Sequence, residues 1–158
     1  MPMRCCIVLW LAAFQVSALA GQVPCESTAG PITTARFREV LETVATAWNT
    51  NQPTVAAGCF ALTAVYLEPP DRQRFEGRDA IESFFRASIA PALPDRMTWH
   101  HLAFDETGQV GLGEYTYRGQ HNYHGVAVVR VTDGLIASWR EYQYPSSEGW
   151  EEFIGPRP

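Results

Sequence analysis

Residues 109–144, QVGLGEYTYRGQHNYHGVAVVRVTDGLIASWREYQY, decide how this chain folds. Within this stretch, three runs alternate apolar and polar side chains, which is the pattern of a strand with one buried face. Two turn signals, at 119–122 and 132–134, separate the runs. The stretch therefore predicts three consecutive antiparallel strands, with the rest of the chain covering one face of the sheet.

The register across these turns decides whether Glu114 and Glu141 face the same space, because a slip of one residue turns every side chain to the opposite face. A four-residue first turn places Glu114 opposite Ala127. A two-residue second turn would place Glu141 opposite Val126, facing away from Glu114. A three-residue second turn places Glu141 opposite Gly125, on the face of Glu114. We favour the three-residue turn, because it puts small residues beside the two carboxylates.

The composition suits one globular domain and excludes several kinds of site. With 158 residues, 46% of them hydrophobic, the chain can build one core. All 12 basic residues are arginine, so there is no lysine for Schiff-base chemistry. The arginines are scattered and the net charge is −5, which does not fit a nucleic-acid-binding surface. No phosphate-binding glycine loop, nucleophile-elbow serine or cysteine–histidine zinc pattern occurs, so we expect neither a cofactor nor a metal site.

Residues 1–20 have the pattern of a secretory signal peptide. Arg4 gives a positive start, residues 5–14 are apolar, and Ala18 and Ala20 form a small-x-small cleavage site. The apolar run is too short to remain in a bilayer as a spanning helix. We therefore expect export to the periplasm or the extracellular space, with no membrane anchor once the signal peptide is removed.

Removal of this leader leaves two cysteines, Cys25 and Cys59, in the mature chain. In an oxidising compartment, an even number of cysteines is typical of disulfide bonding. We predict a Cys25–Cys59 disulfide that ties the N-terminal tail, residues 21–33, to the segment after the first helix.

Helical periodicity precedes the strands in two segments, 34–51 and 78–90, where apolar side chains recur every three or four positions. A short helix at 54–60 and a short strand at 64–68 are expected between them. Helices followed by antiparallel strands are typical of an α+β domain. We expect a curved antiparallel sheet covered by N-terminal helices, which together enclose a cone-shaped pocket.

Three motifs carry a resemblance to a known family. They are residues 66–68 (YLE), the helix start at 77–81 (GRDAI), and a DG turn at 133–134 followed by residues 139–142 (WREY). Together they resemble the SnoaL-like branch of the nuclear transport factor 2-like superfamily, over a domain of residues 34–154. The resemblance implies a cone-shaped α+β fold, chemistry in the cavity and a homodimer through the outer face of the sheet. This scaffold hosts cyclases, dehydratases, isomerases, epoxide hydrolases and non-catalytic binders, so the resemblance implies no single reaction.

Limonene epoxide hydrolase is the closest enzyme pattern for these residues, with two aspartates, an arginine, a tyrosine and an asparagine around a water. By this resemblance, Glu141 matches one acid and Tyr66 matches the tyrosine. Glu114 stands in place of the arginine, Thr116 in place of the second acid and Glu68 in place of the asparagine. Because the set is incomplete, the residues do not predict an epoxide hydrolase.

Glu114 and Glu141, with Glu68 as a possible third carboxylate, are the candidate acid and base. Like charges held together in a poorly hydrated cavity raise the pKa of at least one carboxyl, which leaves one acid and one base at neutral pH. The alternative is that these glutamates bond to tyrosine, tryptophan or backbone groups and only satisfy a polar core.

Two further side chains are candidates to assist. Tyr66 could donate a hydrogen bond to an oxyanion, or be a buried tyrosine with a local partner. His101, rather than His100, is expected to face the cavity as a base or a ligand-orienting group, or to bond within the sheet. The remaining residues expected in the pocket are Trp48, Glu68, Phe84, Trp99, Thr116 and Trp139.

These observations lead to two hypotheses. The first is a secreted, cofactor-independent lyase, isomerase, cyclase or hydrolase that moves protons on a small, largely apolar molecule. The second is a secreted module of the same fold that binds a small hydrophobic ligand or a partner protein without turnover. Placement of Glu114 and Glu141 on opposite faces of the sheet would exclude the paired-carboxylate mechanism.

Overall fold

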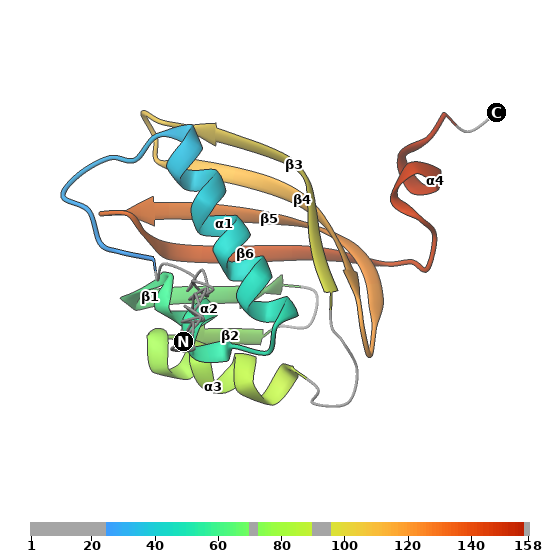
Figure 1. Cartoon of the computed structure of the whole chain (residues 1–158), viewed down its shortest axis with the longest axis horizontal. Coiled ribbons are helices and arrows are strands. Elements are labelled where there is room, and N and C mark those ends of the chain that lie inside the picture. Colours follow the sequence, from blue (N-terminus) through green and yellow to red (C-terminus); the bar gives the residue numbers. More distant parts are fainter. Residues whose placement is uncertain (1–24, 70–72, 90–95, 157–158) are drawn as a thin grey trace, which may run out of the picture.

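The computed structural model describes residues 25–69, 73–89 and 96–156. The predicted signal peptide, residues 1–20, lies outside the described residues, as does the start of the predicted tail. In the described part, helices α1 to α3 lie against a curved sheet and α4 lies apart from them, beyond the far end of the strands (Figure 1). No helix in these ranges is long and apolar enough to cross a membrane.

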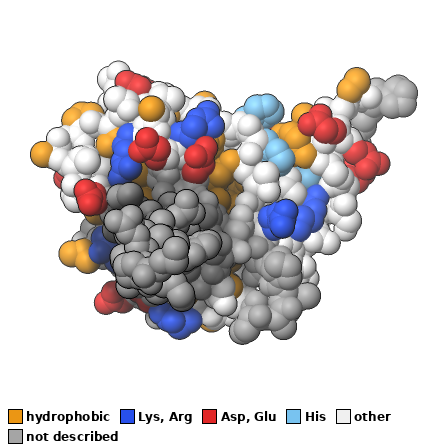
Figure 2. Space-filling view, viewed as in Figure 1, with side chains coloured by type: hydrophobic (Ala, Val, Ile, Leu, Met, Phe, Trp, Pro, Cys, Tyr) orange, Lys and Arg blue, Asp and Glu red, His pale blue; other side chains and the backbone are white. Residues whose placement is uncertain are grey.

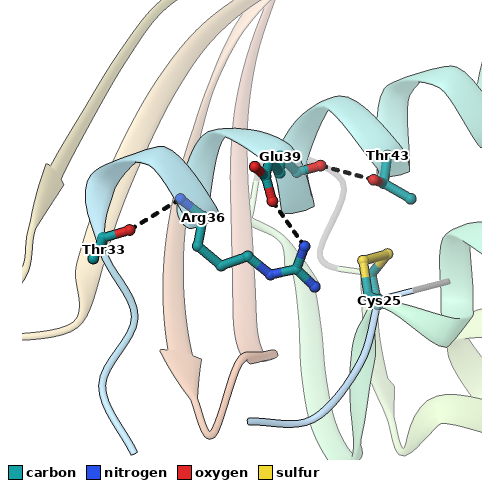
Figure 3. Close-up of polar contacts among 6 residues, drawn as sticks. Cys25, Thr33, Arg36, Glu39 and Thr43 are labelled. Atoms are coloured by element: carbon teal, nitrogen blue, oxygen red, sulfur yellow. Dashed lines mark hydrogen bonds and ion pairs between the residues drawn. A yellow bond between two sulfur atoms is a disulfide. The ribbon is translucent and has the colours of Figure 1, made fainter. Parts of the chain in front are cut away.

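Helix α1 (Thr34–Asn49) forms where the apolar periodicity predicts it. Thr33 caps its start, because the Thr33 hydroxyl accepts a hydrogen bond from the backbone N–H of Arg36 at 3.3 Å (Figure 3). Arg36 also forms an ion pair with Glu39 at 2.9 Å on the solvent side. The buried face consists of Phe37, Val40, Leu41, Val44, Ala45 and Ala47. Burial of this apolar stripe contributes more to the helix than the exposed ion pair does.

Two shorter helices, α2 (Pro53–Gly58) and α3 (Arg78–Ser88), lie beside the first two strands (Figure 1). Gly77 precedes α3 with a φ of 87°, in the left-handed region that glycine adopts without steric cost. The buried residues of α3 are Ile81 and Phe85, from the predicted apolar stripe. Helices α2 and α3 therefore close the side of the molecule that α1 leaves open.

The sheet has six strands in the order β2-β1-β6-β5-β4-β3. Their bounds are β1 (Phe60–Glu68), β2 (Gln73–Glu76), β3 (Arg96–Asp105), β4 (Val110–Arg118), β5 (Asn122–Thr132) and β6 (Leu135–Pro145). The predicted α+β fold with a curved sheet is confirmed, but the sheet is mixed, because β1 pairs with β6 in parallel. A parallel pair needs a long connection, which β2 to β5 and α3 provide. Strand β2 was not expected, since a strand this short gives little periodic signal.

The observed register differs from the predicted one at both turns. The first turn pairs Arg118 with Asn122, which places Glu114 opposite Val126. The second is a two-residue turn whose Asp133 and Gly134 have φ of 49° and 77°, the backbone of a tight hairpin. A β-bulge then shifts the pairing by one residue, so that Glu141 lies opposite Ala127.

The predicted common face for Glu114 and Glu141 is therefore wrong. Val126 and Ala127 are consecutive residues of β5, so their side chains point to opposite faces, and so do the glutamates paired with them. We call the face that packs against α1 to α3 the inner face, and the opposite one the outer face. Glu141 lies on the inner face and Glu114 on the outer face.

The disulfide predicted between Cys25 and Cys59 is present, with an S–S distance of 2.07 Å (Figure 3). It attaches the N-terminal segment next to the start of β1. The backbone N–H of Thr28 also donates to the carbonyl of Asp133 at 2.9 Å, in the β5–β6 turn. The N-terminal segment is thus held to the domain at two places.

Candidate functional site

A cavity of about 290 Å³ lies between the inner face of the sheet and the helices. Strands β1, β4, β5 and β6 supply its floor, whereas α1 and α3 supply part of its wall. The aromatic residues that line it are Trp48, Tyr66, Phe84, Phe85, Tyr115, Tyr117, Tyr123 and Trp139. Glu68 and Glu141 are the two carboxylates in the described lining.

Glu141 is 5% exposed and is bonded to four donors. Its Oε1 accepts from Tyr66 Oη at 2.8 Å and from Trp139 Nε1 at 2.5 Å. Its Oε2 accepts from Tyr115 Oη at 2.6 Å and from Gln143 Nε2 at 3.1 Å. An ionised carboxylate only accepts hydrogen bonds, so this arrangement suits the charged form of Glu141.

The sheet register brings these donors together. Trp139 and Gln143 flank Glu141 at two-residue spacing on β6 and so share its face. Tyr66 is paired with Trp139 across the parallel strands, and their rings stack with centroids 6.2 Å apart. Tyr115 reaches Glu141 from β4 across β5, where Gly125 leaves space for its ring. A Cβ at Gly125 would lie 2.5 Å from Cζ of Tyr115.

A second carboxylate adjoins the first through a shared hydroxyl. Tyr66 Oη lies 3.0 Å from Glu68 Oε1 and 2.8 Å from Glu141 Oε1. Glu68 is 7% exposed and lies two residues after Tyr66 on β1, so both side chains share the inner face. Two carboxylates therefore lie on either side of one tyrosine hydroxyl at the cavity floor.

Tyr66, Tyr115 and Tyr123 remain neutral hydroxyls at ordinary pH. Burial raises the pKa of Tyr66 well above its usual value, and the negative charges of Glu141 and Glu68 raise it further. Burial and Glu141 likewise raise the pKa of Tyr115 and of Tyr123. These tyrosines therefore act as hydrogen-bond donors rather than as phenolates.

The structure places most of the residues expected in the pocket around this cavity. Tyr66, Glu68, Trp139 and Glu141 line its floor, and Trp48 and Phe84 line its wall. Trp99 also lies on the inner face but is not part of the described cavity lining, and its ring contacts Trp139 at a centroid distance of 5.9 Å. Its indole N–H donates to the carbonyl of Leu41 at 3.0 Å, which holds α1 against the sheet.

Glu114, Thr116 and His101 lie on the outer face, which corrects their predicted place in the cavity. His101 Nδ1 lies 2.8 Å from Glu114 Oε2, and these side chains are 65% and 41% exposed. A β-bulge between Trp99 and His101 turns His101 away from the cavity. The paired Glu114–Glu141 mechanism is therefore excluded.

Thr116 belongs to a cluster on the outer face that the sequence did not reveal. Its hydroxyl lies 2.8 Å from His100 Nε2 and 2.9 Å from His124 Nδ1. From α4 (Trp150–Ile154), Trp150 stacks on His100 and Phe153 stacks on His124. Figure 2 shows histidine side chains gathered on the side of the molecule next to α4.

The surroundings of the outer cluster lower the pKa of two of its histidines. Burial, followed by the charges of His124 and His101, lowers the pKa of His100. Burial also lowers the pKa of His124, as does Arg118 nearby. In the described part of the chain, no group of three or more histidine, cysteine, aspartate and glutamate side chains is placed to hold a metal ion.

Tyr115, Tyr123 and Gln143 are among the cavity residues that sequence reasoning missed. The predicted register, which puts Glu114 in the cavity, turns its neighbour Tyr115 to the opposite face of the sheet. The signal that could have corrected this is the pattern of the strands, because the inner-face series of β4 contains Tyr115 and Tyr117, both buried, whereas Leu112 in the opposite series is 44% exposed.

Comparisons with known proteins agree with this fold. A family model for the SnoaL-like domain matches residues 40–139. A protein of unknown function with a cystatin-like fold from Methylobium petroleophilum is 22% identical, with a TM-score of 0.65 over 76% of this chain and 84% of that chain. An NTF-2-like protein of unknown function from Burkholderia xenovorans is 15% identical, with a TM-score of 0.63 over 78% of this chain and 96% of that one.

An LEH-like epoxide hydrolase from M. tuberculosis also shares the fold, with 20% identity and a TM-score of 0.60 over 71% of this chain and 84% of that chain. No curated protein matched the sequence. The structural neighbours establish the fold, and the family model covers most of the domain. The predicted resemblance is confirmed, and the chain belongs to the SnoaL-like domain family.

Proposed function

We propose that this protein is a cofactor-independent enzyme that moves protons on a small molecule held in the inner cavity. The observation that carries the proposal is the Tyr66 hydroxyl, which lies between the carboxylates of Glu68 and Glu141. General acid–base catalysis needs a proton-carrying group next to the substrate, and this arrangement supplies one at the cavity floor.

Counting protons assigns the roles of the two glutamates. A tyrosine has one hydroxyl proton, so Tyr66 can donate fully to only one of the two carboxylates. Glu141 already accepts three other donors and suits the ionised form. Tyr66 Oη lies 3.0 Å from Glu68 Oε1. If Tyr66 gives its proton to Glu141, a hydrogen bond at this second contact needs a proton on Glu68, and we propose that Glu68 carries it. In this arrangement the two carboxyls hold one proton between them.

Glu68 is the group that exchanges this proton with the substrate. It donates the proton to one substrate atom, and the carboxylate so formed takes a proton from another atom. Glu68 returns to its starting state and the substrate is isomerised, or loses a leaving group where the first proton goes to that group. Glu141 stays ionised and, through Tyr66, stabilises the protonated form of Glu68.

A second candidate function is ligand binding without turnover. The observation that favours it is the saturation of Glu141 by four donors, which is also how a purely structural buried carboxylate is held. In that case Glu68 and the aromatic rings serve only to bind the ligand.

We also propose that the protein is exported and forms a homodimer. The Cys25–Cys59 disulfide supports export, since disulfides persist mainly in oxidising compartments. Exposed apolar side chains on the outer face, Leu112 at 44% and Tyr142 at 47% exposure, support a dimer through that face. Light scattering of the mature protein tests the dimer, and a monomer at micromolar concentration would contradict it.

The experiment for the acid–base pair is carboxyl-carbon NMR of glutamate-labelled protein at pH 7. We expect one protonated glutamate signal in the wild type, absent in Glu68→Gln and retained in Glu114→Gln. A wild-type spectrum in which every glutamate is ionised would contradict the proposal that Glu68 carries a proton.

Turnover is tested without knowing the substrate. A library of small molecules is incubated with the protein in deuterated water, and mass spectrometry detects incorporation of deuterium or an isomerised product. The enzyme hypothesis expects such a compound, with activity lost in Glu68→Gln and kept in Glu114→Gln. Compounds that bind but never exchange would support the binding function instead.

A further inference from the structure

Aromatic side chains make up about half of the described cavity lining. Eight of the 17 described lining residues are aromatic, and four of these are tyrosines. Their rings carry a negative electrostatic face, which attracts a cation within about 6 Å of the ring centre. The walls thus offer a cation more than simple apolar contact.

The floor of the cavity is also negatively charged, like the faces of the aromatic rings. Glu141 suits the ionised form, and its four hydrogen-bond partners, two tyrosines, a tryptophan and a glutamine, are all uncharged. The lining within the described ranges contains no arginine, and the chain has no lysine. His121 is the one described lining residue whose side chain could become cationic, and it comes from the exposed β4–β5 turn.

The negative potential extends to the rings themselves. Burial is the largest cause of the raised pKa of Tyr66, Tyr115 and Tyr123, and repulsion by Glu141 is the next cause for each of them. The field of Glu141 therefore reaches tyrosines from three different strands, β1, β4 and β5.

From the aromatic walls and the buried Glu141 we infer that the ligand of this cavity is a small organic ammonium ion with an apolar body. An alkylated ammonium loses little hydration on entering an aromatic pocket, and its charge is favoured by both the rings and the carboxylate. This inference rests on the proposed function, because it names the substrate class of the same cavity.

The size and the chemistry of the cavity limit which cations it can bind. The volume of about 290 Å³ limits the ligand to a small molecule. A metal ion fits poorly, because metals are held by clusters of oxygen, nitrogen or sulfur ligands rather than by rings. The described residues hold no such cluster.

The test compares two molecules of the same shape and different charge. Choline and 3,3-dimethylbutan-1-ol differ in replacing the quaternary nitrogen by carbon, so their affinities isolate the effect of charge. We expect choline, titrated by NMR or calorimetry into the mature protein, to bind at least about tenfold more tightly than the alcohol. Equal affinities, tighter binding of the alcohol, or no binding of choline or tetramethylammonium would overturn the inference.

Variants locate the effect in the cavity. Phe84 lines the cavity, whereas Phe75 stacks on Phe84 at a centroid distance of 4.2 Å without lining it. Phe84→Leu is expected to weaken choline binding several-fold with little change for the alcohol, and the matched control Phe75→Leu to change neither by more than about twofold. Equal losses for both ligands in Phe84→Leu would contradict a cation site.

Removal of the negative charge of Glu141 should have a larger effect on choline binding than the loss of one aromatic ring. Glu141→Gln should reduce the preference for choline over the alcohol to near one, whereas Glu114→Gln on the outer face should leave it intact. If Glu141→Gln does not fold, the Phe84 and Phe75 pair still decides the question.

These outcomes separate the two proposals. A strong preference for choline in a protein with no protonated glutamate supports the ammonium site and contradicts the proton held by Glu68. A protonated Glu68 in a protein with no preference for choline supports the proton held by Glu68 and contradicts the ammonium site.

Discussion

The two faces of one sheet carry glutamates in opposite situations. Glu141 on the inner face is 5% exposed and accepts four hydrogen bonds from neutral donors. Glu114 on the outer face has a side chain that is 41% exposed and contacts His101. Their partners on β5 are consecutive residues, so one step along a strand separates the two environments. The chemistry of a glutamate here follows from its face rather than from its residue type.

The largest expected effect on stability comes from removing the carboxylate of Glu141 on the inner face. In Glu141→Gln, an amide replaces an oxygen that accepts two hydrogen bonds, so buried donors lose their acceptor or face another donor. We expect the free energy of unfolding to fall by about 3–5 kcal/mol, measured by urea denaturation. Glu114→Gln is the matched control, and a cost of under about 0.5 kcal/mol is expected for it. Similar costs for the two variants would contradict the difference between the faces.

The second effect concerns the glycine that lets Tyr115 reach Glu141. In Gly125→Ala, the new Cβ would lie 2.5 Å from Cζ and 2.6 Å from Oη of Tyr115. We expect a loss of about 1–3 kcal/mol in the free energy of unfolding, with a shift of the Tyr115 ring signals in NMR. Gly149→Ala is the control, because nothing lies within 4 Å of its added Cβ. A neutral Gly125→Ala would show that Tyr115 is not held in this position.

The sequence predicted the architecture well because the architecture rests on long periodic segments. The apolar stripe of α1 and the alternation of β4 to β6 extend over many residues, so an error at one position does not change the element. The disulfide followed from the number of cysteines in the mature chain. Strand β2 was missed because its few residues carry no comparable pattern.

The candidate site was predicted less well because it depends on single residues of register. One residue fewer in the β4–β5 turn moved Glu114 and Thr116 to the outer face. One bulge in β3 turned His101 outward, and another in β6 restored Glu141 to the inner face. Turn length and bulges are decided by packing across the whole sheet, which local sequence does not encode. Tyr66 and Glu68 escaped these errors because β1 precedes both turns.

We expect the stability of the folded protein to depend on pH through two histidines of the outer face, His100 and His124. Because burial lowers the pKa of His100 and His124 in the folded protein, the unfolded chain binds protons first as the pH falls below about 6.5. Stability is therefore complete above that pH and decreases below it. The groups facing this pair are Thr116, Arg118, His101, Glu114, Glu151, Trp150, Phe153 and Glu148, whose carbonyl lies 3.1 Å from His124 Nε2.

We expect the melting temperature to fall by about 1–3 °C between pH 7 and pH 5.5 through these two histidines, with a change in tryptophan fluorescence as Trp150 loosens. His124→Phe should reduce this pH dependence, since a ring remains to stack on Phe153 but no proton binds. His121→Gln is the control in the exposed turn and should retain it. A pH dependence unchanged by His124→Phe would place its origin elsewhere.

The smallest effect should come from the exposed pair on the outer face. His101 and Glu114 lie 2.8 Å apart, but their side chains are 65% and 41% exposed, so water and salt screen their attraction. A double-mutant cycle of His101→Ala and Glu114→Ala is expected to give a coupling of under about 1 kcal/mol, falling further at high salt. A coupling as large as the cost of losing Glu141 would mean that exposure does not distinguish the two glutamates. In that case the outer face would be as good a candidate for a functional site as the inner face.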